Sequence, residues 1–371
     1  MSDSPRFGSD PKPFYLAFGV LFLLELVRRA FLAYVPDDFT AYLAASDVFV
    51  HGGDPYTHAI FDAVRYQGKP YNYFPGTLYL VAPLAWVSTT AAVTLDWVAR
   101  GVVLVATLRW LGRRLVPDTR LHFVFLLAVL HEPLMIDLLF GNMVTYLLGA
   151  WAACVWVSER PPSGRDRALV FVCGIVLCFK PFWLLPAAWA LVVRRRWTAV
   201  ALLGCGAGLV VGASFTLPSM LPHFLSHTQQ MRAFYHSVDL LALAPPLLPV
   251  ALAVWAAGAV WLFRNGPREA AFVFGCASIP VWPRLATYSY VMTLPLILFL
   301  ARRYGWFKTL AWSVVLWGPV PWLLRVAPWM PGERLENWVQ FSWSIVTAVV
   351  VFLALRDAAR TPEAADAGAM A

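Results

Sequence analysis

The chain has 371 residues, of which 60% are hydrophobic and only 13% charged, and its mean hydropathy is +0.64. Because soluble domains carry about 25% charged residues, this composition excludes an ordinary soluble fold. Apolar runs of roughly 17–25 residues, long enough to cross a bilayer, recur along the chain, and they lack the alternation of barrel strands. The sequence therefore predicts an all-α polytopic protein of the cytoplasmic membrane.

The net charge of +8 could indicate a nucleic-acid-binding protein, but the basic residues are not placed as a binding face. They cluster in the short breaks between apolar runs: Arg113, Arg114 and Arg120; Arg160, Arg165 and Arg167; Arg194, Arg195 and Arg196; Arg264 and Arg268; Arg302, Arg303 and Lys308; Arg356 and Arg360. Cytoplasmic loops of membrane proteins carry such an excess of Lys and Arg. We therefore expect these breaks to be cytoplasmic and nucleic acid not to be a partner.

The pattern in the first third of the chain predicts a helix that crosses the membrane outward, a long outer segment and a second crossing back to the cytoplasm. A polar cytoplasmic tail at 1–13 precedes an apolar helix at about 14–35. Residues 36–72 then form an amphipathic, aromatic outer segment that suits short helices in the membrane interface. Pro75 and Pro83 break the next 40 mostly apolar residues. We expect a short re-entrant piece at 74–86 and one crossing near 92–112.

The remaining apolar runs predict helices that cross in alternating directions. They are 120–140, 142–158, 168–179, 182–193, 197–217, 240–263, a pair broken at 278–288, 309–325 and 338–355. The runs 168–179 and 182–193 are too short to span alone and meet at Lys180, which predicts a hairpin of partial depth. Outer loops are expected at 218–239 and 326–337. Residues 14–356 thus form one domain of about 11–13 helices, and 357–371 a disordered cytoplasmic tail.

Polar residues that are neither loop charges nor obvious pairs gather at the outer ends of these helices. They are Asp37, Asp38, Asp54, Tyr71, Tyr73, His131, Glu132, Asn142, Lys180, Arg284 and a cluster at 223–236 that holds His223, His227 and His236. With this topology they converge on one extracytoplasmic cavity that opens toward lipid. Such a cavity suits a substrate with a lipid tail and a polar head. Neither the five cysteines nor the histidines have metal-ligand spacing, so no metal or other cofactor is expected.

The chemistry of such a site can be narrowed from the residue types. No serine–histidine motif, zinc-binding HExxH or phosphate-cradling glycine loop is present. The outer face has no nucleotide supply, so an activated sugar must arrive on a lipid such as polyprenyl phosphate. Transfer needs a carboxylate that accepts the proton of the attacking hydroxyl, which Asp38 or Asp37 can supply. It also needs cations for the leaving phosphate, which Lys180 or Arg284 can supply.

Four stretches together resemble the GT-C glycosyltransferases, specifically the glycosyltransferase family 87 (DUF2029) mannosyltransferases. They are DDFTAYLAASDVFVHGGDPY, YNYFPGTLYLVAPLAW, HEPLMIDLLFGNMVTYLLGAW and GIVLCFKPFWLLPAAWALVVRRRW. The resemblance covers residues 30–197 and implies an inverting transfer from polyprenyl-phosphate mannose. It makes the acid before Phe39, which is Asp38, the general base, with Asp37 as its neighbour. Two positions depart from the family pattern: Asn142 stands where glutamine is usual, and Arg284 where a histidine is expected.

Each candidate residue also has a plainer interpretation. Asp38 can be a helix cap, and Asp37 a neighbour that shifts the titration of its partner. Lys180 can extend toward the membrane surface. Asp54, followed by Pro55 and Tyr56, is favoured as a turn former. His131 with Glu132 either lines the acceptor site or forms a satisfied pair, and Tyr71 with Tyr73 either stacks on sugar or belongs to an aromatic belt.

The predicted function is hexosyl transfer, with mannose favoured, to a lipid-linked or glycan acceptor at the outer face. The main alternative is a transporter or flippase of lipid-linked sugars. Transporters commonly contain internal repeats and polar sites near the membrane midplane. The two halves of this chain show no repeat, and the polar residues lie on one side. The enzyme is therefore favoured over the transporter.

Overall fold

The computed structural model describes residues 37–57, 71–116, 141–161, 163–226, 248–265 and 293–305, with position 246 and single positions between 124 and 138. Within these residues the chain is mostly helical and contains no strand, which confirms the all-α prediction for this part. The remaining predicted segments, including the helix at 14–35 and the runs at 309–325 and 338–355, lie outside the described residues. The expected total of 11–13 helices therefore stays a prediction.

The described helices are α2 (Asp37–Val50), η3 (Pro75–Thr77), α3 (Leu78–Val81), η4 (Ala82–Trp86), α4 (Thr89–Leu115), α7 (Val144–Ser158), α8 (Gly164–Leu177), η5 (Pro181–Trp183), α9 (Leu184–Val193), α10 (Trp197–Ser214), α13 (Leu248–Asn265) and α15 (Thr293–Tyr304). Helices α4, α7, α8, α9 and α10 follow the predicted apolar runs within a few residues. Helix α8 begins four residues before the predicted run at 168. The reason is a capping box, in which Ser163 and Asp166 each bond the other's backbone amide.

Two of the described helices, α4 and α10, are long and apolar enough to cross a membrane. Helix α7 and the pair η5–α9 are apolar but shorter. The stretch 74–86, predicted as a re-entrant piece, consists of the short helices η3, α3 and η4. Pro75 begins η3 and Pro83 lies in the first turn of η4, where a missing backbone N–H leaves no helical bond unmade.

Charged groups tie one end of the bundle together. We call this the basic end, and it contains Arg113, Arg114, Arg160, Arg165, Arg167, Arg194, Arg195 and Arg196. Glu159, just after α7, accepts from Nε of Arg114 at the end of α4, at 2.7 Å. Nε of Arg196 donates to the carbonyl of Ser158 at 3.2 Å. These bonds place the C-terminal ends of α4, α7 and α9 and the N-terminal end of α10 together.

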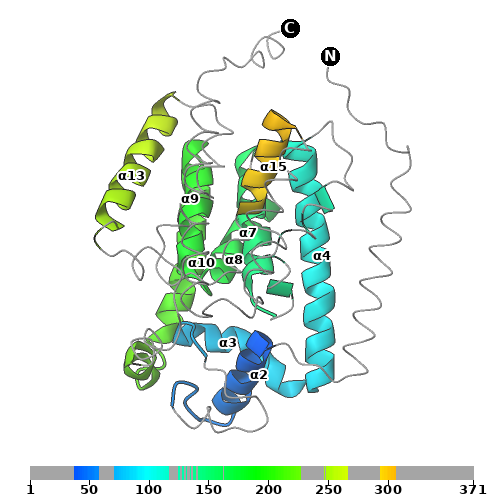
Figure 1. Ribbon diagram of the computed structural model, residues 1–371. Helices are drawn as coiled ribbons and strands as arrows, with labels where there is room; N and C mark the ends of the chain where they lie inside the picture. Colours follow the sequence, from blue (N-terminus) through cyan, green and yellow to red (C-terminus); the bar gives the residue numbers. More distant parts are fainter. Residues whose placement is uncertain are drawn as a thin grey trace, which may run out of the picture.

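The opposite end is formed by α2, the short helices after Tyr73 and the turn at Lys180, and we call it the α2 end. Figure 1 shows α2 and α3 together there, beside the lower end of α4. The backbone amide of Gly76 in η3 donates to Oγ of Ser214, the last residue of α10, at 2.8 Å. Helix α2 was expected in the membrane interface, but its residues 39–45 are all buried. Their apolar side chains pack against the protein rather than lying in lipid headgroups.

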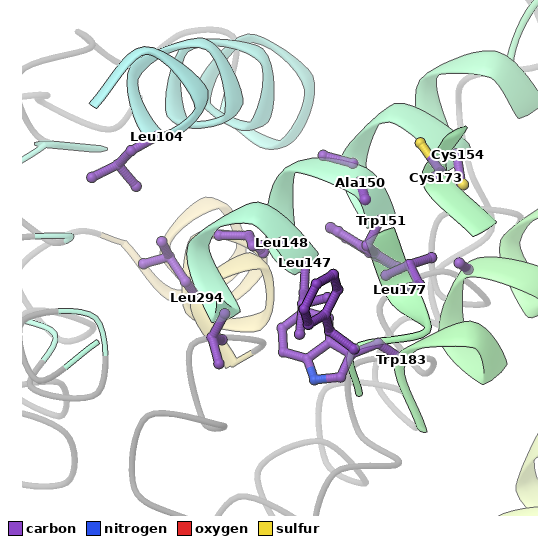
Figure 2. Packing of buried hydrophobic residues seen from close by; sticks show 14 of the residues in the cluster. Leu104, Leu147, Leu148, Ala150, Trp151, Cys154, Cys173, Leu177, Trp183 and Leu294 are labelled. Atoms are coloured by element: carbon purple, nitrogen blue, oxygen red, sulfur yellow. The ribbon is translucent and has the colours of Figure 1, made fainter. Parts of the chain in front are cut away.

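One hydrophobic cluster holds these helices together, and it includes buried residues from Phe39 in α2 to Ala301 in α15. Figure 2 shows its centre, where Trp151 of α7 lies beside Trp183 of η5. Both indoles are at most 1% exposed. Residues 294–301 of α15 are buried all round the helix. The described helices from α2 to α15 therefore share one main hydrophobic core, and the single domain at 14–356 stays a prediction.

Helices α8 and α10 touch backbone to backbone at two glycines. A Cβ on Gly174 would overlap the carbonyl oxygen of Leu203, and a Cβ on Gly206 would overlap the carbonyl oxygen of Phe171. Small residues of this kind let membrane helices approach closely. Gly204, on the same helix, has nothing within 4 Å of its Cβ position.

We expect Gly206→Ala to lower the free energy of unfolding by about 1–3 kcal/mol, because the added methyl must push α8 and α10 apart. Gly204→Ala is the matched control and should be neutral or stabilising by up to about 1 kcal/mol, since alanine favours helix and the space is open. Thermal unfolding of the purified variants in detergent measures both. Equal effects of the two substitutions would contradict the close contact.

Candidate functional site

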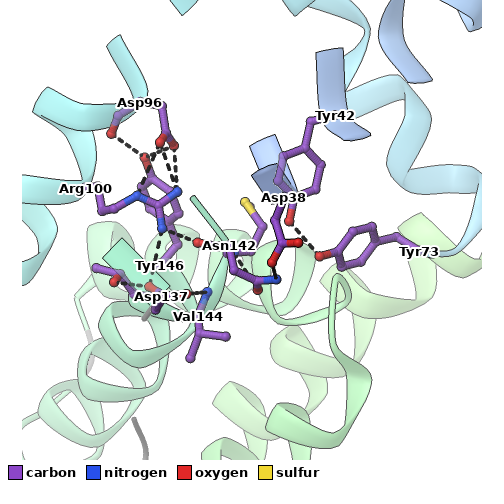
Figure 3. Close-up of polar contacts among 11 residues, drawn as sticks. Asp38, Tyr42, Tyr73, Asp96, Arg100, Asp137, Asn142, Val144 and Tyr146 are labelled. Atoms are coloured by element: carbon purple, nitrogen blue, oxygen red, sulfur yellow. Dashed lines mark hydrogen bonds and ion pairs between the residues drawn. The ribbon is translucent and has the colours of Figure 1, made fainter. Parts of the chain in front are cut away.

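The candidate site is centred on the carboxylate of Asp38, in the first turn of α2. Nδ2 of Asn142 donates to Oδ2 of Asp38 at 2.8 Å, across 104 residues of sequence (Figure 3). Asn142 lies in the turn that leads into α7, and its Oδ1 accepts from the amide of Met143 at 2.8 Å. A carboxylate near a helix N-terminus is also stabilised by the helix dipole. The structure thus holds Asp38 as an oriented, partly exposed acid.

Lys180 is the cation of this site. It lies in the turn between α8 and η5, where its amide donates to the carbonyl of Leu177 at 3.1 Å and its carbonyl accepts from Trp183 at 2.9 Å. Burial lowers the pKa of Lys180 to about 8, while the charges of Asp38 and Asp137 act in the opposite direction. The predicted neighbours Asp38 and Lys180 are therefore within electrostatic reach of each other.

Aromatic rings form one wall around Asp38. The hydroxyls of Tyr42 and Tyr73 lie 2.6 Å apart, and both rings contact Phe179, the residue before Lys180, at centroid distances of 6.5 and 5.4 Å. Burial raises the pKa of Tyr73, and the nearby charge of Asp38 raises it further. Tyr73 is therefore a neutral phenol that reaches the site. Tyr71, at 1% exposure, lies in the core and bonds the hydroxyl of Thr77 at 2.6 Å, which argues against a lipid-facing aromatic belt.

Asp54 forms a turn, as its sequence context predicted. Its Oδ1 accepts from the amide of Tyr56 at 2.9 Å, which closes an Asx-turn. Its Oδ2 lies 2.5 Å from Nδ1 of His223. This contact joins the predicted outer segment 36–72 to the predicted outer loop 218–239. Tyr56 extends the link, because its hydroxyl donates to the carbonyl of Tyr73 at 2.6 Å.

The other predicted site residues are not brought to Asp38 by the contacts described here. His131 is 1% exposed, and its Nδ1 accepts from the amide of Leu134 in its own segment at 3.3 Å. Glu132, Arg284, His227, His236 and the side chain of Asp37 lie outside the described residues. Their roles stay predictions.

Sequence reasoning missed a second group of charges next to the site. Arg100 and Asp96 are four residues apart within the apolar run of α4, and Asp137 lies within the apolar run at 120–140. Arg100 pairs with both carboxylates, at 3.0 Å to Asp96 and 3.4 Å to Asp137. The signal was available in the sequence, because ionisable residues inside apolar segments are rare and usually functional.

The assembled groups suit acid–base chemistry on an anionic substrate. A carboxylate held by a neutral amide can accept a proton, and a lysine beside it can neutralise a developing negative charge. Among the described residues, no three His, Cys, Asp or Glu side chains are grouped as a metal site would require.

Comparisons with protein-family models, with curated proteins and with solved structures found no match to this chain. The resemblance to family 87 glycosyltransferases therefore stays a prediction from the sequence motifs. The case for a function rests on the chemistry of the side chains around Asp38.

We expect Asp54→Ala to lower the free energy of unfolding by about 1–2 kcal/mol, since it removes both the Asx-turn bond and the contact with His223. Asp54→Asn keeps the turn and should lose less than about 1 kcal/mol. In thermal unfolding, the double variant with His223→Ala should be no less stable than Asp54→Ala alone. Additive losses would show that the two side chains do not interact.

Proposed function

We propose that this protein is an integral membrane glycosyltransferase of the GT-C type. It transfers a hexose, with mannose as the first candidate, from a polyprenyl-phosphate carrier to a lipid-linked or glycan acceptor at the outer face of the cytoplasmic membrane. The observation that carries the proposal is the hydrogen bond from Asn142 to Asp38 at the α2 end, where Asp38 and Lys180 lie within electrostatic reach of each other. This arrangement offers a candidate base and a candidate phosphate-binding cation.

The sidedness of the proposal follows from the placement of charge. The basic end holds the arginines of the breaks that follow α4, α7 and α9, and membrane proteins retain such residues in the cytoplasm. Asp38 then belongs to the extracytoplasmic side. Nucleotide-activated sugars are absent there, so the donor must reach the site through the membrane on a lipid carrier.

The proposed reaction is a single displacement at the anomeric carbon. The acceptor hydroxyl gives its proton to the carboxylate of Asp38, and its oxygen forms the new bond to the anomeric carbon. The bond from that carbon to the polyprenyl phosphate breaks, and its electron pair leaves with the phosphate. The ammonium of Lys180 neutralises the added charge. One displacement inverts the configuration of the sugar.

Asp38→Asn should lower kcat by about 10²–10⁴-fold, because the amide cannot accept the proton of the acceptor. The side-chain oxygen of the new asparagine can still accept from Asn142, so the fold and the donor KM should change little. The measurement is transfer by purified protein from polyprenyl-phosphate mannose to a panel of acceptor lipids. Asp47→Asn, at the other end of α2 where the carboxylate is 45% exposed, is the matched control and should keep full activity.

Two outcomes would contradict this assignment. Equal activity of wild type and Asp38→Asn would remove Asp38 as the base. Binding of the donor by the wild type without transfer to any acceptor would favour a carrier of lipid-linked sugars over an enzyme.

Activity should fall as the pH rises through about 8, because the lowered pKa of Lys180 means that its positive charge is present below this pH and lost above it. The loss should be seen in kcat/KM for the donor. Arginine keeps its charge far above pH 8. In Lys180→Arg the fall of kcat/KM should therefore move to higher pH. An unchanged falling limb in this variant would show that Lys180 does not bind the phosphate.

A further inference from the structure

A charge network lies buried directly behind Asn142. The side chain of Arg100 is 1% exposed, and those of Asp96 and Asp137 are 9% and 0% exposed. The guanidinium meets Asp96 in a fork, with both Nε and Nη2 donating to its carboxylate at 3.0–3.2 Å (Figure 3). A buried charge is tolerated only when it is paired and its donors are satisfied. This network is therefore a rigid element of the bundle.

Asp137 fixes the start of α7. Its carboxylate accepts from the amides of Val144 and Thr145 at 3.2 and 3.0 Å, and from the hydroxyl of Thr145 at 2.5 Å. These amides belong to the first turn of the helix, which has no partners within the helix for them. The carbonyl of Asp137 also accepts from the amides of Gly141 and Asn142, at 3.0 and 3.3 Å. One residue thus holds both sides of the turn before α7.

The turn at Gly141–Asn142 depends on its glycine and on Arg100 of α4. Gly141 has a φ of 71°, in the left-handed region that glycine adopts most readily. Nη1 of Arg100 donates to the carbonyl of Asn142 and to Oδ2 of Asp137. The backbone of Asn142 is therefore held at its amide by Asp137 and at its carbonyl by Arg100.

The side chain of Asn142 is then fixed in one orientation. Its Oδ1 must face the amide of Met143, since only the oxygen of the carboxamide can accept that proton. Nδ2 is left to donate, and the group it meets is the carboxylate of Asp38. The contacts form a continuous chain from the buried arginine to the proposed base.

We propose that Arg100 and Asp137 are positioning residues for Asp38, which they act on through the backbone and amide of Asn142. Neither touches Asp38 in the described contacts. Their effect on catalysis rests on the proposed glycosyl transfer, whereas their hold on the Gly141–Asn142 turn does not. Tyr146 supports the arginine, because its hydroxyl donates to Oδ1 of Asp96 at 2.9 Å and its ring centroid lies 5.1 Å from the guanidinium carbon.

The test is a double-mutant cycle between Arg100→Lys and Asn142→Ala. Lysine keeps the positive charge between the two aspartates but lacks the planar fork that also reaches the carbonyl of Asn142. We expect Arg100→Lys to lower kcat by about 10–100-fold with a donor KM within about threefold of wild type. The double variant should be no slower than Asn142→Ala alone, because both substitutions break the same chain of contacts.

Arg109→Gln is the control, since Arg109 is exposed on the same helix and outside the network. It should leave kcat and the unfolding temperature unchanged. Losses in kcat that multiply in the double variant, or a kcat unchanged in Arg100→Lys, would overturn the positioning role.

Hydrogen exchange of the amides of residues 141–147 provides a readout that does not depend on activity. Exchange there should be faster in Arg100→Lys and unchanged in Arg109→Gln. Unchanged exchange in Arg100→Lys would overturn the structural step of the inference, even if the wild type is active. If the wild type transfers no sugar but Arg100→Lys still exchanges faster than the wild type, the proposed function is overturned. The hold of Arg100 on the turn is then intact.

Discussion

The pairing of Arg100 with two buried aspartates is the interaction on which the α2 end depends. A guanidinium inside an apolar helix must find carboxylates, and the two that it finds come from different segments, four and 37 residues away. The pairing fixes how α4 meets the start of α7 before any apolar packing is considered. Hydrophobic contacts can slide by a fraction of a turn at small cost, whereas a buried guanidinium held by Asp96 of its own helix and bonded to Asp137 and to the carbonyl of Asn142 cannot.

The charged residues of the described helices lie mainly at the basic end and at the α2 end, and the two groups differ in burial and in bonding. At the basic end, Glu159 accepts from Arg114 at 2.7 Å and joins the ends of α4 and α7, while Arg113, Arg165 and Arg167 are exposed. At the α2 end, Arg100 and Asp137 are buried and bond each other and the backbone, whereas Asp38 is partly exposed. Apolar side chains fill the length between the ends, so the two sets act independently.

The sequence could predict most of the helices because their signal is local. An apolar run of sufficient length becomes a helix in a membrane wherever its neighbours lie, and α4, α7, α9 and α10 follow their runs closely. The boundary of α8 was missed by four residues because the capping box was not used. The burial of α2 could not be predicted from its amphipathic pattern, since an apolar face looks the same whether lipid or protein covers it.

The candidate site was also only partly predictable from the sequence. Asp38 and Lys180 were named from their chemistry and from motif order, and they lie within electrostatic reach of each other. The choice between Asp37 and Asp38 still rests on the resemblance, since the side chain of Asp37 is outside the described residues. The pair of Asp96 and Arg100 could have been found from its spacing of four residues inside an apolar run, whereas their link to Asp137 depends on which helix faces meet. No spacing along the chain encodes the meeting of Arg100 with Asp137.

The glycine contact between α8 and α10 has a mechanical consequence for this site. Lys180 follows α8 by three residues, and Ser214, which anchors η3, ends α10. Because the two helices meet backbone to backbone at Gly174 and Gly206, neither can shift far without moving the other. The contact between the helices therefore also limits the movement of Lys180 relative to η3, which is bonded to Ser214. A movement that opens the α2 end must therefore come from elements other than α8 and α10.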